Sequence, residues 1–277
     1  MYKLLYNIPM KVGVFCNKAA QRFASVQKNL LDLLRSRGIA YETYETVDEI
    51  GDVEVLVVLG GDGTILKVAI EAGKRGIDLL GINAGNLGFL TQFEGEQTEA
   101  AVDLLLRSFE TEERSVLEVQ VGQKKYYALN DALFQRCYSD EADNNVVTIA
   151  AEIDGKKVDE FVGDGIIVST PTGSTAYSLS AGGSVLTPDL SAFILTPVCA
   201  HSLHNRPIVY NDSHTMQVLH GGESGGLSLY CDGRHVCDPQ EGEQIFLRRA
   251  PFSVRFVKRE DSNFFDKLLF KLNKWSR

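Results

Sequence analysis

The chain has 277 residues, 44% of them hydrophobic, and a formal net charge of −9 at pH 7. This length is enough to bury a large core and to form two domains. The acidic balance disfavours nucleic acid as a partner, because binding to a phosphate backbone favours a basic surface. No apolar run approaches the roughly 18–20 residues that span a bilayer, so we expect no membrane partner.

The first part of the chain alternates between strand and helix patterns. Apolar runs predict strands at residues 11–15, 39–44, 53–59 and 79–83, and helical spacing predicts helices at 19–37, 64–72 and 98–108. Gly38 follows the first helix, at a position where glycine commonly ends helices. The alternation predicts a parallel sheet covered by helices, with ligands outside the carboxyl ends of the strands.

From about residue 112 to residue 252 the pattern changes to short alternating strands. Asp154-Gly155 and Asp232-Gly233 are typical of hairpin turns. We therefore expect an all-β domain here. Its strands are predicted at residues 116–121, 126–129, 146–153, 156–162, 165–169, 208–210, 215–219, 227–231 and 244–248, and a last strand follows at 253–258.

The last segment has the pattern of a basic amphipathic helix. Its apolar residues, which alternate with Lys267, Lys271 and Lys274, are Phe264, Phe265, Leu268, Leu269 and Leu272. Helices on a membrane surface share this pattern. Because surface helices of globular proteins show it as well, we expect this helix to dock its apolar residues on the body of the protein.

Cysteine and histidine residues do not form a recognisable metal-binding pattern. The five cysteines are scattered and include no Cys-x-x-Cys pair, which is typical of reduced thiols in a cytoplasmic protein. His201 and His204 have helical spacing but lack a third ligand, so we expect no zinc site.

A turn of three glycines around one carboxylate, Gly60-Gly61-Asp62-Gly63, follows the apolar run that ends at Leu59. Glycines let backbone N–H groups approach phosphate oxygens closely, and the helix expected from Thr64 adds its positive end. A carboxylate in such a turn would repel phosphate unless it holds a metal or accepts a proton from an attacking hydroxyl. The turn fits neither the Gly-x-x-x-x-Gly-Lys-Ser/Thr nor the Gly-x-Gly-x-x-Gly fingerprint.

Four segments together resemble the NAD kinase family. Gly-Gly-Asp-Gly-Thr is similar to the signature of the superfamily that joins NAD kinases with diacylglycerol and sphingoid-lipid kinases. Three further segments resemble NAD kinase itself: Gly85 to Leu90, Leu129-Asn130-Asp131, and Asp164-Gly165 leading into the run from Ser169 to Gly183. With a compatible tail through Cys231-Asp232-Gly233, the resemblance covers nearly the whole chain.

The resemblance implies a two-domain fold and a reaction. It implies an α/β Rossmann-like nucleotide-binding domain at residues 1–111, to which residues 253–277 return, and an all-β NAD-binding domain at residues 112–252. The active site is expected in the cleft between them. The implied enzyme is a phosphotransferase with an alcohol acceptor, which transfers the terminal phosphoryl group of ATP to the 2′-hydroxyl of the adenosine ribose of NAD. A homodimer or homotetramer is implied as well.

The resemblance also assigns the site residues. Asp62 is implied as the catalytic group that orients the ribose hydroxyl and takes its proton. Asn130 and Asp131 are implied to bind ribose and adenine, and Asp164 the nicotinamide end of NAD. The full set expected to bind the nucleotides is Gly60, Gly61, Gly63, Thr64, Lys67, Asn86, Asn130, Asp131, Asn145, Asp164, Ser174, Thr175, Ala176, Tyr177, Ser178, Leu179, Ser180, Asp232 and Arg234.

The chemistry of the reaction predicts a divalent cation, Mg²⁺ or Mn²⁺. The charge of the γ-phosphoryl group must be neutralised, and the sequence shows no arginine cluster that would do so.

Two positions depart from the family pattern. Many members carry Asn-Glu where this chain has Asn130-Asp131, and the shorter Asp131 leaves its distance to the ribose open. Val162 stands where some bacterial relatives carry arginine, so the preference for NAD over NADH stays open. Two other functions also stay open. A lipid kinase shares the glycine turn but should lack the run from Thr170 to Gly183, and a noncatalytic dinucleotide sensor would need no Asp62.

Overall fold

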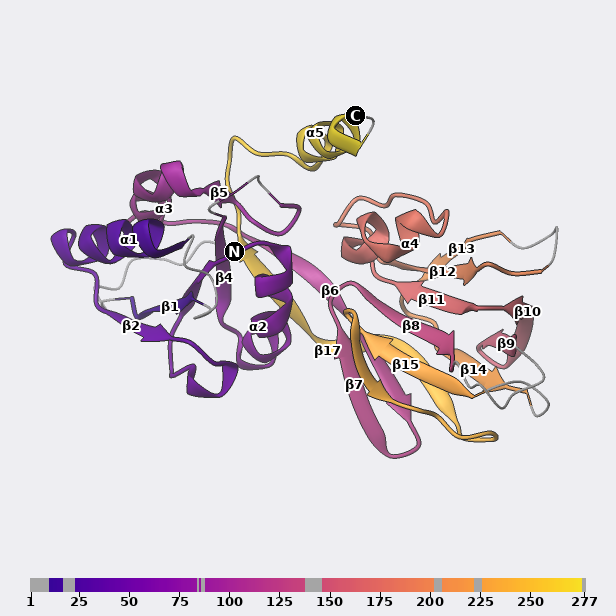
Figure 1. The fold of residues 1–277 in the computed structure, drawn as a ribbon. Helices are drawn as coiled ribbons and strands as arrows, with labels where there is room; N and C mark the ends of the chain where they lie inside the picture. Colours follow the sequence, from indigo (N-terminus) through magenta and orange to yellow (C-terminus); the bar gives the residue numbers. More distant parts are fainter. Residues whose placement is uncertain are drawn as a thin grey trace. The chain divides into compact units, whose positions relative to one another are not determined.

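The computed structural model describes residues 10–16, 23–83, 85, 88–137, 146–201, 206–221 and 226–275. Contacts along the chain separate two compact units (Figure 1). The α/β unit comprises residues 1–113 and 254–277, and the β-rich unit comprises residues 114–253. The α/β unit is therefore discontinuous in the sequence.

The α/β unit is built on a parallel sheet with the strand order β2-β1-β3-β4. Every residue of the three inner strands is buried, as expected for a parallel sheet with both faces covered. The strands are β1 (Val12–Cys16), β2 (Tyr41–Tyr44), β3 (Val55–Leu59) and β4 (Asp78–Asn83), with the short β5 (Phe93–Glu94) parallel to β4. Because β3 and β4 are parallel neighbours, the turns that follow Leu59 and Asn83 lie at the same edge of the sheet, the one at the carboxyl ends of its strands.

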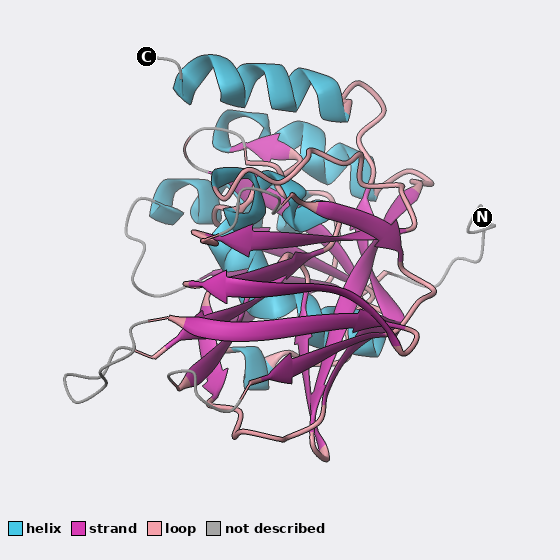
Figure 2. Ribbon diagram, turned by 90° about the vertical axis from the view of Figure 1, so that its right-hand side faces the viewer, coloured by secondary structure: helices cyan, strands magenta, loops and turns pink. Residues whose placement is uncertain are grey.

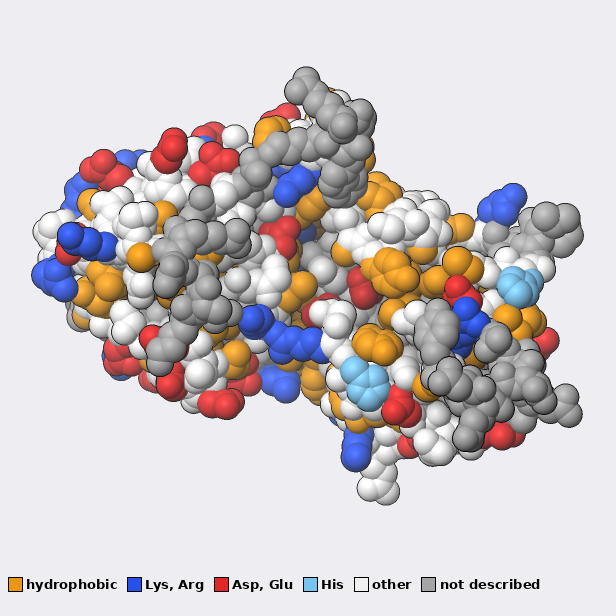
Figure 3. All heavy atoms as spheres, in the orientation of Figure 1, with side chains coloured by type: hydrophobic (Ala, Val, Ile, Leu, Met, Phe, Trp, Pro, Cys, Tyr) orange, Lys and Arg blue, Asp and Glu red, His pale blue; other side chains and the backbone are white. Residues whose placement is uncertain are grey.

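Helices α1 (Ala24–Ser36), α2 (Asp62–Arg75) and α3 (Thr98–Leu105) belong to this unit, with short 3₁₀ turns at Val47–Glu49 and Gly95–Gln97. The sequence predicts a start at Thr64 for the second helix, but α2 begins at Asp62 because the carbonyl of Gly61 already accepts the N–H groups of Thr64 and Ile65. On the α/β unit, basic and acidic side chains are intermixed on the face drawn in Figure 3, and Arg37 pairs with Glu99 and Asp103 of α3.

The β-rich unit contains an antiparallel six-stranded sheet and a second group of strands. The order in the first sheet is β13-β12-β11-β8-β15-β16, and the second group contains β10-β9-β14-β17 and the hairpin β6-β7. Buried side chains from both groups form one core, which includes Phe134, Phe161 and Phe193. The strands are β6 (Thr111–Val121), β7 (Lys124–Ala128), β8 (Asp131–Arg136), β9 (Val147–Ile153), β10 (Lys156–Gly163), β11 (Gly165–Ser169), β12 (Ala192–Val198), β13 (Ile208–Asn211), β14 (Met216–His220), β15 (Leu227–Cys231), β16 (Arg234–Cys237) and β17 (Ile245–Val257).

Both predicted hairpin turns are confirmed. Asp154 and Asp232 have φ angles of 49°, and the glycines that follow each have φ of 74°. Two consecutive positive φ values define the type I′ turn, which matches the twist of the strands it joins. The first turn joins β9 and β10, both of which were predicted, and the second joins the predicted β15 to β16.

Three features of the β-rich unit differ from the sequence-based prediction. Strands β8, β12 and β16 were not predicted, and residues 245–257 form one strand where two were expected. The unit also contains helical turns, a 3₁₀ turn at Thr172–Thr175 and the short α4 (Tyr177–Ser180), within the run that resembles the family motif.

The terminal helix α5 (Phe264–Trp275) forms where its pattern predicts a helix (Figure 2). The prediction that it docks all its apolar residues is wrong. Phe264 and Leu268 are half-buried, whereas Phe265 and Leu269 are 61% and 62% exposed and Leu272 is 44% exposed. Among the described residues, no helix is long and apolar enough to cross a membrane.

A buried carboxylate in the β-rich unit predicts a specific acid sensitivity. Glu118 is only 1% exposed and lies 2.7 Å from Arg248 and 3.3 Å from Lys125. Burial alone would raise the pKa of Glu118, but hydrogen bonds from Arg248 and Lys125 outweigh it, and the pKa lies below the ordinary value of 4.5. Its stabilising contribution is therefore present above that value and lost as the pH falls through the folded-state pKa.

We expect Glu118→Gln to lower the free energy of unfolding at pH 7 by about 1–3 kcal/mol, because the two cations lose their charged acceptor. The difference from wild type should shrink as the pH falls below 4.5. Urea denaturation followed by circular dichroism at several pH values measures both effects. Glu160→Gln is the matched control, since Glu160 pairs with Lys157 at an exposed position and such pairs contribute little. An equal loss in both variants would contradict this prediction.

Candidate active site

The glycine turn lies between the end of β3 and the start of α2. Gly60 is buried and its N–H donates to the carbonyl of Ile82 in β4, which joins the turn to the neighbouring strand. A Cβ atom on Gly60 would lie 2.3 Å from the Thr64 hydroxyl oxygen, so a side chain here would displace the first turn of α2. Gly61 is the N-cap of α2, and Gly63 is exposed with open space around its Cα.

The carboxylate of Asp62 binds the loop that follows β4. Its Oδ2 accepts the N–H of Phe89 at 2.9 Å, and its Oδ1 accepts the N–H of Leu90 at 3.0 Å. A Cβ atom on Gly88 would lie 1.9 Å from Oδ1, so only glycine at this position leaves room for the carboxylate. The structure thus brings together two of the sequence motifs, Gly60 to Thr64 and the Gly88-Phe89-Leu90 end of the second.

Other residues predicted around the turn lie nearby on α2 or outside the described residues. Thr64 is half-buried in the first turn of α2, and Lys67 is exposed on the next turn. The N–H of Thr64 already donates to the carbonyl of Gly61. The first N–H groups of a helix, here those of Asp62 and Gly63, have no intrahelical acceptor and are suited to bind an anion. Asn86 lies outside the described residues.

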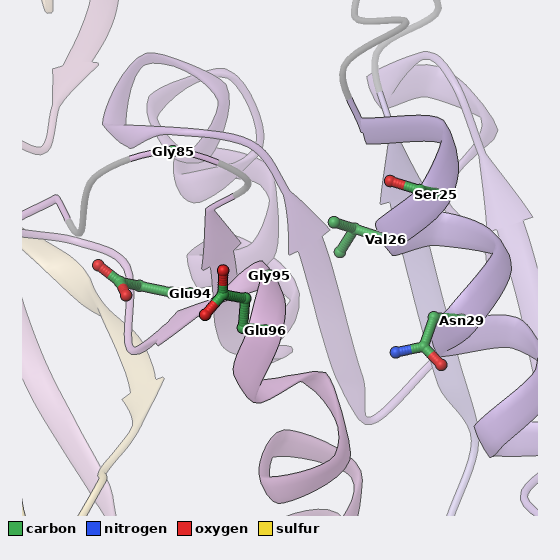
Figure 4. Close-up of a pocket in the computed structure, with 7 residues that line it drawn as sticks. All are labelled: Ser25, Val26, Asn29, Gly85, Glu94, Gly95 and Glu96. Atoms are coloured by element: carbon green, nitrogen blue, oxygen red, sulfur yellow. The ribbon is translucent and has the colours of Figure 1, made fainter.

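A pocket of about 350 Å³ opens in the same unit, close to the loop after β4. Figure 4 shows Val26 and Asn29 projecting from α1 toward the segment that carries Glu94 and Glu96. Gly85 and Ser25 also line this pocket. Among the described residues, no group of three or more His, Cys, Asp or Glu side chains is arranged to hold a metal ion.

In the β-rich unit, Asp232 shapes the motif Leu129-Asn130-Asp131. Its carboxylate accepts the N–H groups of Leu129 at 2.9 Å, Asn130 at 2.7 Å and Asp131 at 3.3 Å. The sequence assigns Asp232 to nucleotide binding, and in the structure its two carboxylate oxygens accept these three backbone donors. Asp232 therefore positions Asn130 and Asp131, whose own side chains remain available.

Asn130 has an unused acceptor. Its side-chain oxygen is buried and has no hydrogen-bond partner among the described residues. Because burying an unpaired amide oxygen is costly, this atom fits a site that receives a donor from a ligand, such as a ribose hydroxyl or an adenine amino group.

Asp131 is 6% exposed. Burial, and then the nearby charge of Asp232, raises the pKa of the Asp131 carboxyl to about 7. Burial raises the pKa of Asp232 as well, but three backbone donors favour its ionised form. No described residue donates a hydrogen bond to the Asp131 side chain. The proton of this pair therefore resides on Asp131.

Hydroxyl groups of the run from Thr170 to Gly183 are mostly used inside the protein. The Ser174 hydroxyl donates to the carbonyl of Pro171 and accepts the N–H of Leu186, and the Thr175 hydroxyl donates to the carbonyl of Thr172. The Ser178 hydroxyl bonds to that of Thr196. Tyr177 is 43% exposed, Ser180 is exposed, and Ala176 and Leu179 are half-buried.

Asp164 forms an ion pair that the sequence analysis missed. Its Oδ1 lies 3.0 Å from Nε of Arg136, and its carbonyl accepts the N–H of Arg136. The register of β8 beside β11 brings these residues together, and since β8 itself was not predicted, no sequence signal paired them. Arg234 is exposed on β16 and Val162 is exposed on β10, whereas Asn145 and His204 lie outside the described residues.

A glycine turn at a helix start with one fixed carboxylate, and an unpaired buried amide oxygen at Asn130, fit a nucleotide-dependent phosphotransferase. The ATP-NAD kinase N-terminal domain model matches residues 10–111, and the ATP-NAD kinase C-terminal domain model matches residues 135–259. The chain belongs to the NAD kinase family.

Full-length relatives agree with these matches. An NAD kinase of Caldicellulosiruptor bescii is 34% identical over 265 residues, which are 95% of this chain and 99% of the relative. An NAD kinase of Leifsonia xyli is 39% identical over 79% of this chain and 73% of the relative. The sequence-based assignment of the family is confirmed.

Solved structures have the same fold. An NAD kinase from Archaeoglobus fulgidus in complex with ATP is similar with a TM-score of 0.79 and 27% identity, and the match covers 95% of this chain and 98% of that one. Yeast NADH kinase complexed with NADH has a TM-score of 0.85 at 23% identity over 97% and 89% of the two chains, which shows the fold. The predicted two-domain fold class is confirmed.

Asp131 gives a pH prediction that does not depend on activity. Its folded-state pKa of about 7 exceeds the ordinary value of 3.8, so the folded protein retains a proton that the unfolded chain releases. This contribution to stability is complete at low pH and is lost as the pH rises through about 7. We expect Asp131→Asn to gain stability relative to wild type as the pH rises from about 5 to about 7, inside the window between the two pKa values, and the difference to level off above it.

Chemical denaturation of both proteins at each pH measures this difference. Asp189→Asn is the matched control, because Asp189 is exposed and hydrogen bonds from Thr187 and its own backbone lower its pKa, so it is ionised throughout this window. A pH-independent difference for Asp131→Asn would show that Asp131 does not hold the proton.

Proposed function

We infer that the protein is an NAD kinase, which transfers the terminal phosphoryl group of ATP to the 2′-hydroxyl of the adenosine ribose of NAD and releases NADP and ADP. Curated relatives that cover nearly the whole chain carry this name, and a related structure contains ATP. The observation that carries the inference is the Asp62 carboxylate, fixed by two N–H groups beside a phosphate-binding turn. The comparisons do not support a lipid kinase or a noncatalytic sensor.

Asp62 is proposed to orient the ribose hydroxyl and to accept its proton. A ribose hydroxyl is a weak nucleophile, so a carboxylate held in a fixed position assists the attack as the oxygen–phosphorus bond forms. The N–H groups of Phe89 and Leu90 hold both carboxylate oxygens, each of which has further lone pairs for a hydroxyl. The open N–H groups at the start of α2 and the exposed Lys67 are proposed to bind the phosphates.

In the β-rich unit, Asn130 and Asp131 are proposed to bind the ribose and adenine of NAD, and Asp164 its nicotinamide end. The unpaired amide oxygen of Asn130 supports this role. At pH below about 7 a protonated Asp131 can also donate a hydrogen bond, so the pair offers both an acceptor and a donor. Asp164 is held by Arg136 in a fixed position.

A divalent cation, Mg²⁺ or Mn²⁺, is proposed to enter with the triphosphate. The described residues contain no cluster of three or more ligating side chains. This fits Mg²⁺, which commonly keeps several waters and binds through substrate phosphates and one or two carboxylates. When bound, the cation neutralises charge on the phosphate oxygens.

We also propose that the protein is cytoplasmic and forms a dimer or tetramer. The cysteines support a reducing compartment, because all five are free, including Cys16 and Cys231, which are buried. The oligomer rests on the family resemblance, and light scattering of the purified protein tests it.

Asp62→Asn tests the catalytic role directly. The substitution removes the base and replaces one carboxylate acceptor by an amide NH₂ donor that faces a backbone N–H. We therefore expect the rate of NADP formation to fall by roughly 10²- to 10⁴-fold while NAD binding is retained. NADP is measured with an NADP-specific dehydrogenase, and NAD binding by calorimetry. The control is Asp52→Asn, an exposed carboxylate of the same unit, which should keep wild-type rates. Wild-type activity in Asp62→Asn would remove Asp62 from the mechanism.

Removal of divalent cations is expected to abolish phosphoryl transfer from ATP. Dialysis against EDTA should stop NADP formation, and added Mg²⁺ or Mn²⁺ should restore it, because the triphosphate charge is then neutralised again. Unfolding in the absence of nucleotide should be the same with and without EDTA, since the cation enters with ATP. Full activity in EDTA would contradict the proposed cofactor.

A further inference from the structure

The loop that holds Asp62 is also held from its other side by the terminal helix. The Nζ atom of Lys267, in the first part of α5, donates to the carbonyl of Thr91 at 2.9 Å. Thr91 is fully buried. The two residues are separated by 176 positions in the sequence, so this contact exists only when the C-terminal segment has returned to the α/β unit.

Aromatic contacts attach α5 to the same loop. The Phe89 ring lies 6.4 Å from the Phe264 ring, centroid to centroid, and Nζ of Lys271 lies 5.9 Å from the Phe89 ring centroid. Offset aromatic rings and a cation near an aromatic face both contribute modestly favourable contacts. Phe89 is therefore held at its side chain by α5 and at its N–H by Asp62.

The rest of the loop is similarly fixed. The N–H of Gly88 donates to the hydroxyl of Thr91, and the Gln92 side chain donates to the carbonyl of Leu90. The N–H of Gln92 donates to the carbonyl of Gly81 in β4, and the N–H of Gly81 donates to the Gln92 side chain. Arg259 of the C-terminal segment donates to the main-chain carbonyl of Gln92. The C-terminal segment thus supplies the donors for two consecutive carbonyls, those of Thr91 and Gln92.

We propose that Lys267 is a positioning residue for the reaction and that it acts through the Gly88–Gln92 loop on Asp62. This inference rests on the proposed function of Asp62 as the group that orients the hydroxyl. Lys267 fixes the Thr91 carbonyl, the loop then presents the N–H groups of Phe89 and Leu90, and these N–H groups set the orientation of the Asp62 carboxylate. Misplacing a reacting group by about 1 Å can lower a rate by about 100-fold.

Lys267→Met tests the contact, because methionine keeps a flexible apolar side chain of similar length and removes the charged donor. We expect kcat for NAD phosphorylation to fall by roughly 10- to 100-fold while KM for NAD and for ATP changes little, since the substrates bind as before but the hydroxyl is poorly oriented. Lys267→Arg retains donors and should restore most of the rate. A raised KM with an unchanged kcat would contradict a positioning role.

Two matched controls separate this effect from general damage to the C-terminal segment. Lys258→Met removes a lysine that pairs with Glu110 at an exposed position, and Leu269→Ala changes an exposed residue of α5 itself. Both should keep the wild-type kcat. If they lose as much rate as Lys267→Met, the effect is nonspecific and the proposal fails.

A second readout does not require activity. Amide hydrogen exchange at Phe89 and Leu90, measured by NMR, should become faster in Lys267→Met and stay unchanged in both controls, because these are the N–H groups that the loop presents to Asp62. If the wild-type protein does not phosphorylate NAD but Lys267→Met still speeds exchange at Phe89 and Leu90, the proposed function fails. The structural coupling between Lys267 and the loop then still stands. Unchanged exchange overturns the coupling.

A double-mutant test connects the two readouts. When Asp62 is already Asn, the orientation of its side chain no longer controls the rate, so Lys267→Met should cause little further loss of kcat. Losses that multiply in the double variant would show that Lys267 acts independently of Asp62 and would overturn the proposal.

Discussion

Two hydrogen bonds to the Asp62 carboxylate are the interaction on which the proposed catalytic arrangement depends. They join the glycine turn after β3 to the loop after β4, strands that lie side by side in the parallel sheet. The junction is possible only because Gly88 has no side chain where the carboxylate lies. The two N–H donors and the helix N-terminus offset part of the negative charge of this carboxylate, and they set its orientation before a ligand arrives.

The β-rich unit uses a carboxylate in a related way. Asp232 lies in a type I′ turn and gathers the N–H groups of three successive residues, which fixes Asn130 and Asp131 at the start of β8. Asp131 has no such donors and therefore carries the proton of the pair. In each unit, one acidic side chain accepts backbone N–H groups and thereby fixes a segment proposed to meet the nucleotides. In the β-rich unit, burial then raises the pKa of Asp131.

Local patterns predicted the parts of the fold that depend on nearby residues. The alternating strands and helices, both type I′ turns and the helical terminal segment follow from side-chain periodicity and from Asp-Gly pairs. Strands β8 and β12 were missed because Asp131 was interpreted only as part of a motif and because Pro197 interrupts an apolar run. The uses of Asp232, Ser174 and Ser178 were not predictable, since a sequence shows a polar group but not whether the protein itself already occupies it.

The discontinuous α/β unit explains why the environment of Asp62 could not be predicted from its motif. Residues 10–113 supply the sheet and both loops, but Lys267 and Arg259 come from the segment that follows the whole β-rich unit. β17 brings this segment back, pairing with β4 at Phe256, and Arg255 forms an ion pair with the buried Asp78. The adjacent strands β3 and β4 therefore place the Asp62 carboxylate next to the Gly88–Gln92 loop. Contacts from Lys267 and Arg259, near the C-terminus, hold that loop in its final conformation. This division makes catalytic geometry sensitive to substitutions far from the motif in sequence.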